Sequence, residues 1–135
     1  MRAAVVGSRT YLGQHDVCRL VRVLVARHGE ALVVVSGGAA GVDRWAEAEA
    51  RRLCASVVVY AADWHPGGGP LRRGAGMARN TTIVENSDIL YAFHHDRSRG
   101  TLDTIRKAVV RGIPCWVCTP STTFTQGAAY LQDFV

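Results

Sequence analysis

The sequence predicts a single domain of the α/β class, built on an open, mostly parallel five-stranded sheet with helices on both faces. Short apolar runs alternate with helical patterns along the chain. Parallel strands are buried on both faces and so read as continuous apolar runs, while the helices between them cover the sheet. A length of 135 residues suits one domain with one core. We therefore assign residues 1–135 to one domain without repeats or linkers.

Three predicted strands and two predicted helices occupy the first half of the chain. Residues 2–7 and 31–37 are valine-rich runs that end in glycine, and residues 56–61 form a third valine-rich run. Apolar residues at helical spacing predict helices over 14–28 and 42–53.

The second half continues the alternation. Helical spacing predicts a helix over 75–86, followed by a strand over 88–93. A further helix ends at Gly112, and residues 115–118 form the fifth predicted strand. Residues 119–135 are poorly patterned, so we predict a tail there.

The composition is that of a globular protein with a basic surface. Hydrophobic residues make up 48% of the chain and charged residues 20%, and the net charge is +5. This charge favours anionic partners such as nucleotides and nucleic acids. No apolar run approaches the roughly 18 residues of a membrane span, so we expect a cytoplasmic protein with no membrane partner.

The cysteines are predicted to be reduced thiols of the core, because they lie in apolar segments without the spacing of a secreted disulfide framework. Two of them have CxxC spacing, but they occupy a predicted strand, and a redox pair needs a helix N-terminus to acidify its first thiol. The four residues are Cys18, Cys54, Cys115 and Cys118.

The loops that follow the predicted strands are the candidate ligand site, because open α/β sheets bind ligands beyond the carboxyl ends of their strands. These loops are residues 7–10, 36–43, 63–74 and 94–101. Three contain glycine beside a helix start, where unpaired N–H groups favour an anion and glycine lets a phosphate approach the backbone. This pattern predicts a binding site for the phosphate of a nucleotide. The segment 63–74 is rich enough in glycine to act as a lid or binding loop.

The turn at Gly37, Gly38 and Gly41 nearly matches the spacing of a dinucleotide fingerprint, but it follows the second strand. The chain has neither GxGxxG after the first strand nor a P-loop, so a standard NAD site and P-loop phosphoryl transfer lack support. The alternative, that these glycines only allow tight strand-to-helix turns, stays open.

Arginines in or beside these loops supply the second indication, because a guanidinium can grip phosphate through two donors. Any one of them could equally be a solvated surface charge. They are Arg9, Arg72, Arg73, Arg79, Arg97 and Arg99.

Aromatic residues and histidines complete the set of candidates. Trp64 lies in the glycine-rich loop and could stack on a base or anchor the loop, whereas Trp45 and Trp116 are predicted core residues. His94 and His95 are neighbours without a third ligand. We expect no metal and no cofactor.

Five segments in order, "GSR", "SGGAAGVDRWAEAEA", "ADW", "AGMARN" and "DILYAFHHDRSRGT", resemble the YspA/YpsA-like branch of the SLOG superfamily over residues 4–115. That superfamily has a Rossmann-like fold and includes the "lonely guy" phosphoribohydrolases and DNA processing protein A. The resemblance implies a Rossmann-like nucleotide-binding domain. It also implies a possible homodimer, because members of the superfamily commonly form dimers.

The resemblance also implies the ligand-binding residues, which lie in the glycine turns and their neighbours. With the flanking candidates, they are Gly7, Ser8, Arg9, Gly37, Gly38, Ala39, Gly41, Asp43, Asp63, Trp64, Arg79, Asn80, Ser98, Arg99, Gly100 and Thr101.

In the phosphoribohydrolases, a PGGxGTxxE segment and an arginine on the preceding helix cleave the base from the ribose. Gly100 and Thr101 match the GT pair and Arg79 matches the arginine, but Thr104 stands at the glutamate position. Asp103 is one residue away, which on a helix turns the side chain by about 100°. The resemblance therefore makes Arg79 and Asp103 the candidate catalytic residues.

Asp43 and Asp63 are the other candidate acids, because an oxocarbenium-like transition state needs a nearby carboxylate. Asp43 begins a helix, where an acid commonly has a structural role.

Three hypotheses follow. The first is a domain that binds a small nucleotide-derived ligand, to sense, sequester or process it. The second is a nucleoside 5′-monophosphate phosphoribohydrolase. The third is a single-strand DNA-binding protein, which the basic charge permits but which needs aromatics along a basic groove.

Overall fold

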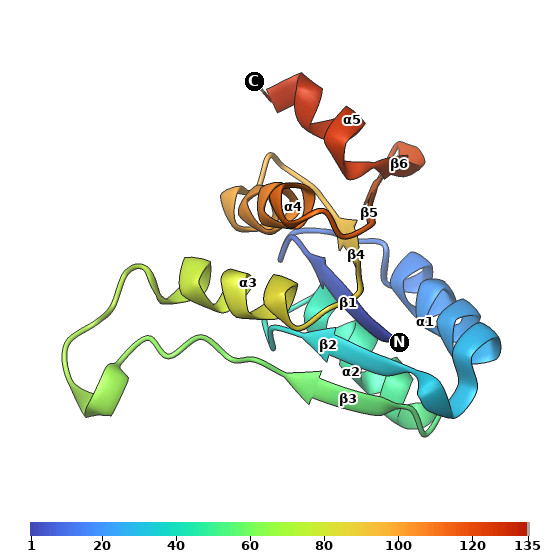
Figure 1. Cartoon of the computed structure of the whole chain (residues 1–135), viewed down its shortest axis with the longest axis horizontal. Coiled ribbons are helices and arrows are strands. Elements are labelled where there is room, and N and C mark those ends of the chain that lie inside the picture. Colours follow the sequence, from blue (N-terminus) through green and yellow to red (C-terminus); the bar gives the residue numbers. More distant parts are fainter. Residues whose placement is uncertain (135) are drawn as a thin grey trace.

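The computed structural model describes residues 1–134; Val135, the last residue of the predicted tail, lies outside the described residues. A single six-stranded sheet of order β3-β2-β1-β4-β5-β6 organises the chain (Figure 1). Strands β1 to β5 pair in parallel and β6 pairs antiparallel to β5. The strands are β1 Arg2–Gly7, β2 Val33–Ser36, β3 Ser56–Val59, β4 Ile89–Phe93, β5 Cys115–Thr119 and β6 Thr122–Gln126. The predicted α/β class and mostly parallel sheet are confirmed, but the sheet has six strands instead of five.

The sixth strand comes from the predicted tail. Strand β6 has the sequence TTFTQ, with four of its five residues exposed. Its register, with Thr119 opposite Thr122 and Trp116 opposite Gln126, makes it the outer arm of a hairpin. An edge strand of this kind is defined by backbone pairing to β5, so its sequence carries no buried-strand pattern. Helix α5 (Gly127–Leu131) and a 3-10 turn (Gln132–Phe134) follow it.

Helices cover both faces of the sheet, as predicted (Figure 1). Helices α1 (Gln14–His28) and α2 (Val42–Arg52) pack on one face, around Val5, Val21 and Val34. Helices α3 (Ala75–Glu85), α4 (Arg99–Arg111) and α5 pack on the other, around residues such as Val35, Leu90 and Ile105. The helix bounds agree with the predictions to within a few residues.

The strand order creates the crevice that the sequence predicts. The chain leaves β1 through α1 toward β2, but it returns from β3 through α3 to β4 on the other side of β1. The connections after β1 and β4 therefore diverge, and ligands of open α/β sheets bind at such a switch point. The segment between β3 and α3 extends away from the body of the molecule, with a short 3-10 turn, Pro66–Gly68, as its only regular structure among the described residues (Figure 1).

Two residues predicted for the core are at the surface. Trp116 is 36% exposed on β5, and Cys54 is exposed in the turn after α2, where its φ is +60°. Cys115 and Cys118 are buried but belong to the two opposite cores of the sheet, so their CxxC spacing does not pair them. Burial raises the pKa of the Cys115 thiol to about 12. No helix within residues 1–134 is long and apolar enough to cross a membrane.

Candidate functional site

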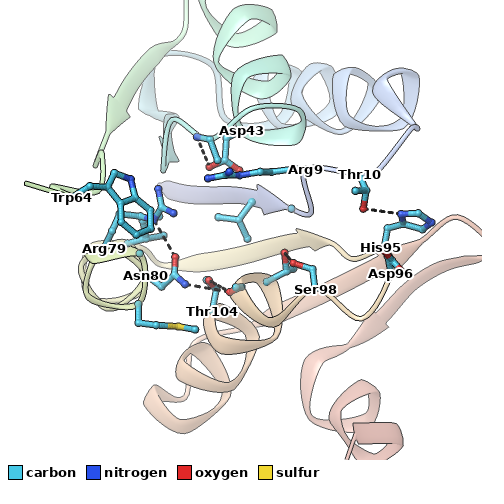
Figure 2. Close-up of a pocket in the computed structure, with 18 of the residues that line it drawn as sticks. Arg9, Thr10, Asp43, Trp64, Arg79, Asn80, His95, Asp96, Ser98 and Thr104 are labelled. Atoms are coloured by element: carbon cyan, nitrogen blue, oxygen red, sulfur yellow. Dashed lines mark hydrogen bonds between the residues drawn. The ribbon is translucent and has the colours of Figure 1, made fainter. Parts of the chain in front are cut away.

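A cleft of about 420 Å³ opens at the carboxyl ends of β1 and β4 (Figure 2). Most of the residues that were predicted to bind ligand line it. They are Gly7, Arg9, Ala39, Asp43, Trp64, Arg79, Asn80, Ser98, Gly100 and Thr101, together with Arg73 from the predicted arginine set. The topology therefore brings together residues from four separate loops and from the first turns of α2, α3 and α4.

A second cleft of about 300 Å³ adjoins the first. It contains Gly37 and Gly38 of the predicted turn. Four residues line both clefts, namely Arg9, Ala39, Trp64 and Arg79.

The glycine turn after β2 holds a carboxylate of the chain itself. The N–H groups of Gly37 and Ala39 both donate to Asp43 Oδ2, each at 3.2 Å. Gly41, with φ +84°, supplies the left-handed conformation that leads the chain into α2. Because Asp43 occupies these two donors, a ligand phosphate cannot use them while the turn keeps this conformation.

Burial is the main cause of the raised pKa of the Asp43 carboxyl. The side chain is only 4% exposed, and loss of hydration raises the pKa of its carboxyl to about 6. The Ala39 and Gly37 N–H groups and the positive charge of Arg79 oppose this rise, whereas Glu47 adds to it. The hydrogen bonds and the charge of Arg79 thus offset only part of the free energy that the Asp43 carboxylate loses on burial.

Arg9 and Arg79 place two positive charges at the same end of the first cleft (Figure 2). Arg79 Nη1 donates to the Gly37 carbonyl at 2.5 Å, and its Nε donates to Asn80 Oδ1 at 3.1 Å. Burial lowers the pKa of Arg79, Asp43 opposes that effect, and the like charge of Arg9 lowers it further. Within residues 1–134 neither guanidinium forms an ion pair. The two groups repel each other and would be stabilised by an anion between them.

The N-terminus of α4 forms another wall of the cleft. Ser98 is the N-cap residue, and within residues 1–134 no side-chain cap hydrogen bond is made to the first N–H groups of the helix, which lack intrahelical partners. Ser8 is 2% exposed and does not line the cleft, contrary to the prediction. Its hydroxyl lies 3.3 Å from Thr101 Oγ1 and accepts the His95 N–H at 2.9 Å. Ser8 therefore joins the loops after β1 and β4 beneath the cleft.

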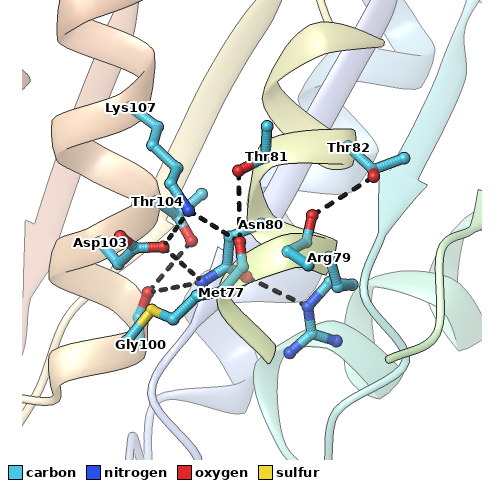
Figure 3. Close-up of polar contacts among 10 residues, drawn as sticks. Met77, Arg79, Asn80, Thr81, Thr82, Gly100, Asp103, Thr104 and Lys107 are labelled. Carbon is cyan, nitrogen blue, oxygen red and sulfur yellow. Dashed lines mark hydrogen bonds and ion pairs between the residues drawn. The ribbon is translucent and has the colours of Figure 1, made fainter. Parts of the chain in front are cut away.

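Asp103 lies outside the cleft, between α3 and α4 (Figure 3). Its Oδ2 is 2.8 Å from Lys107 Nζ and accepts a hydrogen bond from Asn80 Nδ2 at 3.1 Å. Thr104, one residue on, does line the cleft, and its hydroxyl donates to the Gly100 carbonyl at 3.1 Å. The catalytic role predicted for Asp103 therefore has no support from its position, because α4 directs its side chain to α3.

Three other predicted ligand residues, Gly41, Asp63 and Arg99, do not line either cleft. Nor does Arg97, whose guanidinium carbon lies 4.9 Å from the centroid of the Phe134 ring.

The first cleft also contains residues outside the predicted ligand-binding set, namely Val6, Thr10, Gly76, Met77, Ile83, His95, Asp96 and Thr104. His95 Nδ1 lies 2.9 Å from Thr10 Oγ1, which ties the loop after β1 to the loop after β4. Asp96 and Arg97 have φ values of +55° and +50°, a conformation that strains residues other than glycine and that clusters at functional sites. His95 and Asp96 lie in the predicted ligand loop 94–101, whereas Met77 and Ile83 lie within α3 and carried no sequence signal for a ligand site.

His94 connects the cleft to the C-terminal helix. Its Nε2 lies 3.1 Å from the Ser98 carbonyl, which can only accept, so Nε2 carries the proton. Its Nδ1 therefore accepts from the Tyr130 hydroxyl, at 2.5 Å. Burial lowers the pKa of His94; the bond to Ser98 opposes this, and the charges of His95 and Arg97 contribute to it. This neutral imidazole holds the N-cap of α4 against α5.

The lowered pKa of His94 predicts a loss of stability in acid. Below the unfolded pKa of 6.5 the unfolded chain binds a proton at His94 that the folded chain does not, so the contribution of His94 to the free energy of unfolding falls as the pH decreases. Urea unfolding at pH 7.5 and pH 5.5 is the measurement, and we expect His94→Gln to lose less stability than the wild type between these values. His15→Gln, at an exposed position, should behave as the wild type does. Parallel pH curves for His94→Gln and the wild type would contradict this assignment.

No protein-family model matches the chain. Among curated proteins, the Gene 61 protein of Mycobacterium phage D29 is 33% identical over 119 residues, which cover 84% of this chain and 92% of the phage protein.

Two solved structures of DNA processing protein A are similar to the chain. The protein from Helicobacter pylori, studied for its unique single-stranded DNA binding mode, has a TM-score of 0.71 at 20% identity and is matched over 99% of this chain and 72% of its own. The protein from Streptococcus pneumoniae has a TM-score of 0.71 at 20% identity over 98% of this chain. The match covers 56% of that protein, so this chain spans little more than half of its length. These similarities show that the chain has the Rossmann-like fold of these two structures.

Proposed function

This chain belongs to the family of the Gene 61 protein of Mycobacterium phage D29, and from this premise we propose that its first cleft binds the phosphate of a nucleotide-derived ligand. The name of that relative states no activity, so the proposal rests on the cleft. The observation that carries it is the pair of guanidinium groups, Arg9 and Arg79, that line one cleft without an ion-pair partner in residues 1–134. Such a pair is a binding site for an anion with several oxygen acceptors.

The α4 N-terminus supports a phosphate in particular. Ser98, Gly100 and Thr101 line the cleft at the first turn of this helix, where free N–H groups and the helix dipole favour an anion. The glycine turn after β2 contributes in a different way from the one predicted, since its amides bind Asp43. Its role in this proposal is to hold Arg79 through the Gly37 carbonyl.

Apolar groups in the same cleft suit a nucleobase. Trp64 is 40% exposed and lies against Gly76 in the first turn of α3, and Met77 and Ile83 also line the cleft. A volume of about 420 Å³ falls within the range of small-ligand sites. A base can stack on the Trp64 ring while its phosphate contacts the arginines.

We propose binding without glycosidic cleavage. Thr104 stands where the phosphoribohydrolases have glutamate, and Asp103 is paired with Lys107 outside the cleft. Asp43, a carboxylate that does line the cleft, already accepts two backbone hydrogen bonds.

Single-stranded DNA is the second candidate ligand. Its support is the fold similarity to the H. pylori protein, whose study concerns single-stranded DNA binding, and the net charge of +5. A strong decrease of affinity with salt would favour it, because each neutralised phosphate releases counterions.

Removal of the Arg79 guanidinium tests the proposal. Calorimetric titration with the four deoxynucleoside 5′-monophosphates should detect binding, and Arg79→Met should weaken it by at least about tenfold, equivalent to roughly 1.4 kcal/mol. Arg111→Met, at an exposed position at the end of α4, should not change the affinity. No binding to the wild type, or an equal effect of both substitutions, would reject the proposed site. Proton NMR of the same mixtures checks for cleavage, which would appear as loss of the anomeric signal and release of free base.

A further inference from the structure

The second cleft has the lining of an anion site. Its charged residues are Arg9, Arg44 and Arg79, and no carboxylate from residues 1–134 lines it. The remaining lining is almost all glycine and alanine from the turn after β2 and from residues 61 and 62, with Trp64 beside them. Small side chains leave the guanidinium groups accessible to a ligand.

The charged donors of this cleft are arginine side chains, because three amides of the glycine turn already have acceptors within the chain. The Gly37 and Ala39 N–H groups donate to Asp43, and the Gly38 N–H donates to Ser36 Oγ at 3.4 Å. Arg44 is exposed, and its Nε makes a long bond of 3.4 Å to the Gly38 carbonyl. The terminal nitrogens of Arg44 have no other hydrogen-bond or ion-pair partner within residues 1–134.

The two clefts are parts of one groove, because Arg9, Ala39, Trp64 and Arg79 line both. Ser98, Gly100 and Thr101 of the α4 N-terminus line only the first cleft, and Arg44 lines only the second. Each part of the groove thus has its own group for an anion, and the Trp64 ring lines both parts.

We propose that Arg44 binds a second phosphate, so that the ligand consists of two nucleosides linked through phosphate. This inference rests on the proposed function of the first cleft. One phosphate lies at Arg79 and the α4 N-terminus, the second lies at Arg44, and Trp64 contacts a base. A free dinucleotide and two successive nucleotides of a single strand share this chemistry.

A length series tests the proposal. Each deoxynucleoside 5′-monophosphate is compared by calorimetry with its 5′-phosphorylated homodinucleotide (pApA, pCpC, pGpG and pTpT), using the full chain. The dinucleotide of the preferred base should bind the wild type at least about tenfold more tightly than the monophosphate. Arg44→Met should remove this gain and change monophosphate affinity less than about twofold. Arg19→Met, at an exposed position on α1, should leave both affinities unchanged.

The outcomes separate this inference from the proposed function. If monophosphates bind and depend on Arg79, but dinucleotides bind no more tightly or Arg44→Met has no selective effect, the second site is rejected and the first stands. If neither ligand binds the wild type, both proposals fail. If the dinucleotide does bind more tightly, the oligonucleotides dT10 and dA10 distinguish a single strand from a free dinucleotide as the ligand. An affinity well above that of the dinucleotide identifies a strand, and an equal affinity identifies a dinucleotide. Circular dichroism confirms that the exposed Arg44 variant is folded.

Discussion

Gly7→Ala is expected to lower the free energy of unfolding by about 3 kcal/mol. A Cβ at this position would lie 2.6 Å from Val42 Cγ2 and 2.7 Å from the Phe93 carbonyl oxygen. That oxygen belongs to the neighbouring strand β4 and accepts the Ser8 N–H at 2.9 Å, so it cannot move without disturbing the sheet. Gly7 is therefore required by the close packing of β1 against α2 and β4, in addition to lining the cleft.

Gly100→Ala is the matched control for this prediction. Gly100 lies in the first turn of α4, and apart from its chain neighbours and the backbone of α4 itself, a Cβ there would meet no atom of residues 1–134 within 4 Å. The same chemical change should stabilise the protein by up to about 1 kcal/mol, because alanine favours the helix. Urea unfolding measures both variants. A Gly7→Ala midpoint equal to that of the wild type would show that β1 is not packed as described.

Asp43→Asn is expected to stabilise the protein by about 1–3 kcal/mol at pH 7. Folding raises the pKa of the Asp43 carboxyl from 3.8 to about 6. Between these values the folded chain binds more protons than the unfolded chain, so stability falls as the pH rises through the window. The ionised side chain therefore costs stability at pH 7. Asparagine removes the charge and keeps an oxygen for the Gly37 and Ala39 N–H groups, which both donate to the same atom of Asp43.

The pH dependence identifies the cause of this effect. At pH 4 the folded wild type carries a neutral Asp43, so the advantage of Asp43→Asn should largely disappear. Asp63→Asn, at an exposed position, should stay within about 0.5 kcal/mol of the wild type at both pH values. If Asp43→Asn destabilises the protein equally at pH 7 and pH 4, the attraction between Asp43 and Arg79 outweighs the cost of burial.

Local pattern was sufficient for the central elements of the fold. Valine runs at β1 and β2 and the helical spacing in α1 and α2 report burial directly, because a residue that faces a core must be apolar whichever residues it meets there. The position of the cleft also followed from the sequence, since parallel strands place the loops after β1 and β4 at one edge. Strand β6 did not follow, because its place at the sheet edge depends on backbone pairing with β5.

The sequence alone therefore determined the α/β class, the order of the main elements and the edge of the sheet where Gly7, Arg9 and Arg79 meet. Only the tertiary structure decided which polar groups at that edge remain free to bind a ligand. Asp43 occupies two amides of the glycine turn, and α4 directs Asp103 outside the cleft, where it pairs with Lys107. The reason is physical: periodicity encodes which side of an element is buried, whereas the partner of a donor or a charge is set by distances between segments far apart in the chain.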